Sequence, residues 1–345
     1  MIWLTWRQFR TQTYVALVLL AAAAAYLLIS GHQLHHSYTV DLATCQTSSN
    51  CSDVLDALQS QYNGPLDLVE LLLMAVPALI GIFWGAPLIA AELERGTHYT
   101  AWHQSVTRTR WLAVKLTLVG FASVLTAGVL SLLVTWWTSP LDTLTGNRFG
   151  IQAFNARDIT PLGYAAFAFV LGAVLGLLFR RAVPAMAATI AIFIAVQILV
   201  SAGLRPHLLP ATTVSLPINQ TTMSQAIRFD RSASTTGPVL IDLAAPAGAW
   251  DLSQTQALGP NGQPIQTSAI ISCWSQMAAG PGAKGGPPDF SSLGACLAPQ
   301  HLHVDMTYQP AYRYWQLQWM ETAFYTVLAA LLAAVCFRRI RRVRG

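Results

Sequence analysis

Six long runs of apolar residues are the dominant pattern in this chain, and each is about as long as a membrane-spanning helix. Inside a bilayer the backbone polar groups have no water to bind, so spanning segments of this kind must be helical. The pattern therefore predicts six transmembrane helices. They cover residues 14–30, 68–91, 112–138, 162–179, 183–203 and 319–337.

The first 13 residues place three aromatic side chains at a spacing of three, with two arginines among them. This spacing puts the rings on one face of a helix and predicts an amphipathic helix, residues 1–13, in the membrane interface. A disordered start is the alternative. A basic segment before an apolar run also fits a signal peptide, but no small-residue cleavage site follows before His32. We therefore expect the first run to be retained as a helix.

The segment 204–314 differs from the rest of the chain, because it is rich in Gly, Pro, Ser, Thr and Gln and has few long apolar runs. It has the size of a small domain. Residues 301–308 alternate strictly between polar and apolar, which predicts a half-buried strand. Residues 239–243 and 269–274 are further strand candidates. We therefore predict a small β-containing domain between the fifth and sixth helices.

The basic residues set the expected orientation, because cytoplasmic loops of membrane proteins carry an excess of Lys and Arg. Of the 20 Lys and Arg residues, 13 fall on the side of the two termini, including the cluster in residues 338–345. The fold class we expect is an all-α polytopic membrane protein with cytoplasmic termini and an extracellular domain. Residues 14–203 would form helices one to five, and residues 315–345 helix six and a basic tail. The net charge of +5 then follows from topology and gives no reason to expect nucleic acid binding.

The five cysteines are distributed as expected for an oxidising outer side. Cys45 and Cys51 lie in the first outer loop, Cys273 and Cys296 in the outer domain, and Cys336 near the inner end of helix six. We predict disulfides between the members of each outer pair. Unpaired cysteines are the alternative, and neither pair has the usual zinc spacing.

Two prolines and two glutamates within the apolar runs are weaker candidates for function. The second helix contains Pro77 and Pro87, which we expect to kink it. Glu70 and Glu321 lie at outer helix ends, and we expect both to remain solvated at the interface rather than to take part in transport.

Three histidines form a cluster at the outer end of helix one, with the pattern HxxHH. Metal binding there would need supporting partners that a sequence does not show. We expect no metal site and interpret the three residues as polar groups at a helix end. They are His32, His35 and His36.

Familiar enzyme motifs are missing from the chain. It contains no GxxxxGK[ST] phosphate loop, no HExxH, no GxSxG and no GxGxxG. We therefore expect that the chain itself is not an enzyme.

One short polar segment, residues 92–111 (ELERGTHYTAWHQSVTRTRW), separates the second and third apolar runs. Gly96 should end the second helix, and Thr97 can cap a new one. Three apolar residues then follow at positions i, i+3 and i+7, on one face of a short helix. They are Tyr99, Trp102 and Val106. Such a face suits docking into a groove of a partner protein, and contact with lipid headgroups is the alternative.

The stretch from FWGAPLIAAELERG to TRTRWLAVKL, residues 83–116, resembles the permease subunits of type-2 ATP-binding-cassette transporters, especially actinobacterial ones. The order of six helices and the interfacial helix fit the same family. The resemblance implies a coupling helix after helix two that fits into an ATPase subunit. It also implies an assembly of two permeases and two ATPases. The region 204–314 departs from the family pattern, because it is larger than the outer hairpins of minimal members.

The resemblance implies roles for particular residues. Those expected at the ATPase-facing end of helix two are Glu92, Glu94, Arg95, Gly96 and Thr97. Those expected in the coupling helix are Tyr99, Ala101, Trp102, His103, Gln104 and Ser105. Weaker candidates for a substrate cavity are Phe83, Trp84, Phe193 and Gln197. The chain would hold no cofactor, because ATP and magnesium would bind to the partner ATPase.

The resemblance thus implies the permease of an ATP-driven exporter, in a bacterial cell membrane. It would act by alternating access as a homodimer in membrane lipid, and few charges with many aromatics suggest a hydrophobic or amphipathic substrate such as a drug, peptide or lipid. One alternative is a membrane sensor whose outer domain binds a ligand and whose cytoplasmic loop recruits a partner. Another is a membrane enzyme acting on lipid, although the intramembrane acid or histidine cluster expected of it is not evident.

Overall fold

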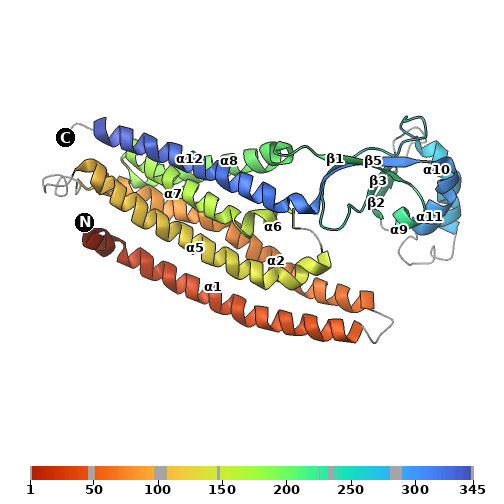
Figure 1. Ribbon diagram of the computed structural model, residues 1–345, viewed down its shortest axis with the longest axis horizontal. Helices are drawn as coiled ribbons and strands as arrows, with labels where there is room; N and C mark the ends of the chain where they lie inside the picture. Colours follow the sequence, from red (N-terminus) through yellow and green to blue (C-terminus); the bar gives the residue numbers. More distant parts are fainter. Residues whose placement is uncertain are drawn as a thin grey trace. The chain divides into compact units, whose positions relative to one another are not determined.

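The computed structural model describes residues 2–45, 51–96, 107–145, 148–224, 226–231, 237, 239–279 and 290–342. The chain divides into two compact units (Figure 1). Unit 1 combines residues Met1–Leu208 with Tyr314–Gly345, and unit 2 is Leu209–Arg313. The first contains the long helices and the second contains the strands, as the composition of the segments predicts.

Six helical segments of unit 1 are long and apolar enough to cross a membrane, which confirms the predicted number. Two of them include a turn of π-helix or 3₁₀-helix. In chain order they are α1 (Ile2–Cys45); α2 (Cys51–Ile80) with η1 (Gly81–Gly85) and α3 (Ala86–Glu94); α5 (Arg108–Thr145); α7 (Thr160–Phe179); α8 (Ala182–Ile198) with η2 (Leu199–Leu204) and η3 (Arg205–His207); and α12 (Tyr314–Arg342), preceded by η6 (Ala311–Arg313). A short helix, α6 (Ile151–Ala156), connects α5 to α7.

The N-terminal segment is helical, as predicted, and continues into the first span within α1. The side chains of residues 1–9 lie outside the described part of the chain, so the predicted aromatic face stays a prediction.

Helix α7 is the centre of unit 1. It packs against α3, α5, α8 and α12, and 72% of its span is buried, compared with 11% of the span in α1. A helix that is apolar on all sides is typical of such a central position. The opposite holds for α1, which lies at the edge of the bundle beside α5 and α2 (Figure 1).

Backbones come into direct contact where the second span crosses α7. The π-turn η1 lies between Pro77 and Pro87, where the sequence predicts a distortion. A Cβ atom added to Gly172 would lie 2.4 Å from the carbonyl oxygen of Gly81, and one added to Gly85 would lie 2.4 Å from the oxygen of Phe169. Small residues permit this close approach, as is common between membrane helices.

Unit 2 contains two small antiparallel sheets. The first has the order β1-β5-β4, and the second pairs β2 with β3. The strands are β1 (Thr212–Pro217), β2 (Ala226–Arg231), β3 (Val239–Leu243), β4 (Trp250–Gln254) and β5 (His303–Gln309). The helices are α9 (Gln220–Ser224), α10 (Thr267–Ala279) and α11 (Phe290–Leu297), followed by the 3₁₀ turn η5 (Ala298–Gln300).

The predicted strands at 239–243 and 301–308 are confirmed as β3 and β5, but the strand predicted at 269–274 is wrong. That segment belongs to α10. Ile270 and Cys273 are buried there, whereas Ile271 and Ser272 between them are exposed. A spacing of three places the buried pair on one helix face, where they join the core of unit 2.

One of the two predicted disulfides is confirmed, because Cys273 and Cys296 are bonded and join α10 to α11. The other prediction involves the side chain of Cys51, which lies outside the described residues. Cys336, expected to be unpaired, is a free and buried thiol.

Reduction of the Cys273–Cys296 bond is expected to destabilise unit 2 by about 3 kcal/mol, from the entropy of closing a loop of 23 residues. Thermal unfolding of the purified protein with and without reductant would measure the loss. Alkylation followed by mass spectrometry would verify which cysteines become reactive. Equal stability of the oxidised and reduced forms would contradict the expectation.

Candidate functional site

The C-terminal end of α3 is tied to two other helices through two carboxylates. Glu92 forms an ion pair with Lys115 of α5, whose side chain is only 4% exposed. The ammonium of Lys115 also lies 4.7 Å from the centroid of the Trp111 ring. Two residues further on, Glu94 accepts a hydrogen bond of 3.1 Å from the backbone N–H of Ala182, the first residue of α8. We call this group of five residues the α3 junction.

The contact of Glu94 with α8 has a simple electrostatic reason. The first N–H groups of a helix lack intrahelical partners, and the helix dipole favours a negative charge there. Glu94 therefore supplies an acceptor that α8 lacks, since the residue before α8, Arg181, makes no side-chain capping bond. The ionised acceptor makes this a stronger bond than one between neutral groups.

The segment after the junction follows the sequence prediction as far as the structure describes it. Arg95 is exposed, and Gly96 has a φ of +70°, a left-handed conformation that ends the helix. The chain is described again from Thr107, whose hydroxyl accepts a hydrogen bond from the N–H of Arg110 at the start of α5. The other predicted coupling residues lie outside the described residues. They are Thr97, Tyr99, Ala101, Trp102, His103, Gln104 and Ser105.

The sequence indicates the two glutamates of the α3 junction but not their partners. Lys115 counts in the sequence only as a basic residue near a membrane boundary, and Ala182 carries no polar side chain. A lysine eight residues into an apolar helix is nevertheless a signal, because a charge in such a position requires a partner.

The four candidates for a substrate cavity have different surroundings. Phe83 is 54% exposed and Trp84 is partly buried. Phe193 is buried, with its ring centroid 6.3 Å from that of Phe167, and Gln197 accepts a hydrogen bond from Tyr325. Of the four, Phe83 is the one with a largely exposed side chain. That the four side chains line one substrate cavity therefore remains a prediction.

A buried charged cluster joins α8, α12, α7 and α6 at the other end of the bundle. Arg205 donates to both carboxylate oxygens of Glu321, at 2.7 and 2.8 Å, and the Tyr164 hydroxyl donates to the same carboxylate at 2.6 Å. Arg205 also donates to the side-chain oxygen of Asn155, and its guanidinium lies 4.1 Å from the ring centroid of Phe154. We call this group the Arg205 cluster.

A second buried cluster is centred on Arg157, two residues after Asn155 of the Arg205 cluster. Arg157 forms ion pairs with Glu70 of α2 and Asp142 of α5. Arg148, which is about half exposed, lies 3.4 Å from the other oxygen of Asp142. Together with the Arg205 cluster, this Arg157 cluster links α6 and the residue that follows it to five other helical segments.

The expectation that Glu70 and Glu321 remain solvated is therefore wrong. Glu70 is 4% exposed and Glu321 is fully buried. Glu70 is neutralised by Arg157, and Glu321 by Arg205. Burial is tolerated because both carboxylates are paired and hydrogen-bonded, as buried charges must be.

The histidine cluster is not assembled into a metal site in the described part of the chain. His35 stacks on Trp136 with ring centroids 5.0 Å apart, and its Nε2 lies 3.2 Å from the carbonyl oxygen of Trp136. Among the described residues, no three His, Cys, Asp or Glu side chains lie together in a way that could hold a metal ion.

Comparison with protein families gives one match. The model of the family described as "ABC-2 membrane transporter related" matches residues 17–205, more than half of the chain. The matched region covers nearly all of the first five spans and contains the α3 junction, and it ends at Arg205. No curated protein and no solved structure matches the chain.

Proposed function

The chain belongs to the ABC-2 membrane transporter related family, and from this premise we propose that it is the permease subunit of an ATP-driven exporter. Membership and the six apolar spans identify it as a multi-pass membrane protein and an ABC-2 type transport permease. Members of this family generally work with an ATPase subunit. Export, the partner's copy number and the substrate are part of the proposal.

The observation that carries the proposal is the α3 junction. The loop after α3 is the expected contact with the ATPase, and Glu92 and Glu94 connect the last turn of α3 to α5 and α8. A displacement of that loop would therefore move three spans rather than one. In the proposed cycle, ATP binding brings the loops of two permease copies together, and hydrolysis resets them. ATP drives such a change only through its differential affinity for the two states.

The proposed orientation places unit 2 outside the cytoplasm. Its Cys273–Cys296 disulfide is of a kind that persists in oxidising compartments, whereas the thiol of Cys336 near the opposite end of α12 is free. Arg338, Arg339 and Arg341 lie exposed at that same end of α12, as expected of a cytoplasmic boundary. The apolar bundle with few charges favours a hydrophobic or amphipathic substrate.

A co-purification experiment tests the proposal. The tagged permease would be purified with the ATPase encoded beside it, and ATP turnover of the complex would be recorded. Trp102→Ala is expected to reduce association of the ATPase. Glu94→Ala is expected to preserve association of the ATPase. It should lower the ATP turnover of the complex roughly tenfold, because one charge-assisted bond between α3 and α8 is lost.

Asp67→Asn is the matched control for Glu94→Ala, since it removes an exposed acid of the same long helical segment, 27 residues before Glu94. It should leave both association and turnover unchanged. If no ATPase associates with a well-folded wild-type permease, the exporter proposal fails. The sensor alternative, in which the cytoplasmic loop recruits another protein, would then be favoured.

A further inference from the structure

Helices α1 and α2 extend past the ends of α6 and α7 as a hairpin (Figure 1). Glu70 of α2 is level with the beginning of α7, because it pairs with Arg157. The 20 residues of α7 span about 30 Å, the thickness of a hydrocarbon core. Gln61 precedes Glu70 by nine residues, and Val54 by sixteen, so they lie about 13 to 24 Å from Glu70 along the axis of α2.

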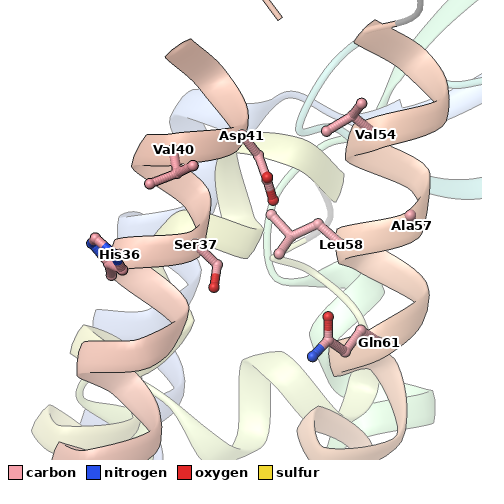
Figure 2. A pocket seen from close by; sticks show the side chains of 8 residues that line it. All are labelled: His36, Ser37, Val40, Asp41, Val54, Ala57, Leu58 and Gln61. Carbon is pink, nitrogen blue, oxygen red and sulfur yellow. The ribbon is translucent and has the colours of Figure 1, made fainter. Parts of the chain in front are cut away.

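A cavity of about 710 Å³ lies in this part of the hairpin, between α1 and α2. Figure 2 shows Asp41 of α1 and Leu58 and Gln61 of α2 projecting into the space between the helices, whereas His36 points away from it. Val40 and Val54 add apolar surface to the lining. The volume is within the usual range for small-molecule sites.

This part of the hairpin contains acidic residues but no lysine or arginine. Residues 28–69 contain four aspartates and no lysine or arginine. Within the described residues the carboxylate of Asp41 has no hydrogen bond or ion pair, and it faces the cavity. A carboxylate beside an apolar wall complements a ligand with one positive charge and an apolar body. The Gln61 side chain, which also projects into the cavity, offers both a donor and an acceptor to such a ligand.

We propose that the cavity between α1 and α2 is a binding site for a small hydrophobic cation, such as an organic ammonium ion. Asp41 would pair with the charge, and Leu58, Val40 and Val54 would contact the apolar part. The site lies between α1 and α2, away from the α3 junction. It therefore does not depend on the proposed exporter function, and a permease that lacked an ATPase would still have it.

Calorimetric titration of the full-length protein in nanodiscs of zwitterionic lipid tests the proposal, with empty nanodiscs as the blank. The probe is benzyltrimethylammonium. Asp41→Asn is expected to weaken binding about tenfold, and Asp41→Glu to retain most of it. Ala57→Trp, which fills the cavity from α2, is expected to abolish binding.

Asp67→Asn again serves as the control, because it removes an exposed acid from α2 outside the cavity and should leave binding unchanged. Melting temperatures of all variants would verify folding. Three results would overturn the proposal. They are no binding to the wild type at millimolar probe, equal binding after Asp41→Asn, and equal binding of neopentylbenzene, the uncharged isostere of the probe.

Discussion

Replacement of Arg205 by alanine is expected to lower the free energy of unfolding by about 3–5 kcal/mol, the cost of breaking a buried ion pair by removing one partner. The variant leaves the carboxylate of Glu321 fully buried, with the Tyr164 hydroxyl as a remaining donor. It also removes the cation from the face of the Phe154 ring, and the side-chain oxygen of Asn155 loses the hydrogen bond that Arg205 donates to it. Thermal or denaturant unfolding in a defined detergent would measure the effect.

Two further variants separate this electrostatic effect from a loss of packing. The double replacement Arg205→Met with Glu321→Leu should recover most of the stability, because apolar residues of similar volume often replace buried ion pairs without loss. Arg148→Ala should cost less than about 1 kcal/mol, since Arg148 is about half exposed and Asp142 keeps its ion pair with Arg157. Equal losses for Arg205→Ala and Arg148→Ala would contradict the interpretation of the Arg205 cluster.

Gly172→Ala is expected to destabilise the bundle by about 3 kcal/mol, at the upper end of the usual cost of overpacking. The new methyl group would lie 2.4 Å from the carbonyl oxygen of Gly81 and 2.7 Å from the amide nitrogen of Ala86. Both are backbone atoms, so no side chain can rotate away to make room. The crossing of α7 with η1 and α3 would have to widen, which the melting temperature would report.

The matched control, Gly128→Ala, should have the opposite sign. Gly128 lies within α5, and a methyl group there would meet only the Leu162 side chain, at an ordinary 3.6 Å or more. Alanine is favoured over glycine inside a helix by about 0.5–1 kcal/mol, so the control should be neutral or slightly stabilised. A similar loss of stability in both variants would show that the close crossing with α7 is not the cause.

The spans were predictable because length and hydrophobicity are local properties, and a membrane allows only helices for such segments. The same local character explains the correct end of α3 at Gly96, where a left-handed residue is needed. The error at residues 269–274 has the same origin. A short apolar run does not distinguish a strand from a helix, and only packing against the core of unit 2 selects α10.

The buried clusters were not predictable, because their partners are far apart in the sequence. Glu70 and Arg157 are separated by 87 residues, and Arg205 and Glu321 by 116. Each of these residues lies at the end of an apolar run, where a charge is usually solvated. Three-dimensional pairing alone reveals that they are neutralised inside the bundle. The partners of Glu92 and Glu94 were missed for the same reason.

The segment that leads into unit 2 and the segment that leaves it are joined to each other on both sides of the boundary between the units. Within unit 1, Arg205 before the insertion is paired with Glu321 after it. Within unit 2, the first residue of β1, Thr212, pairs with Tyr308 near the end of β5. Both units therefore close on themselves at the point where the chain passes from one to the other. Segments with adjacent ends are those that evolution can insert, exchange or delete as a cassette, because the host fold needs only a short bridge in their place.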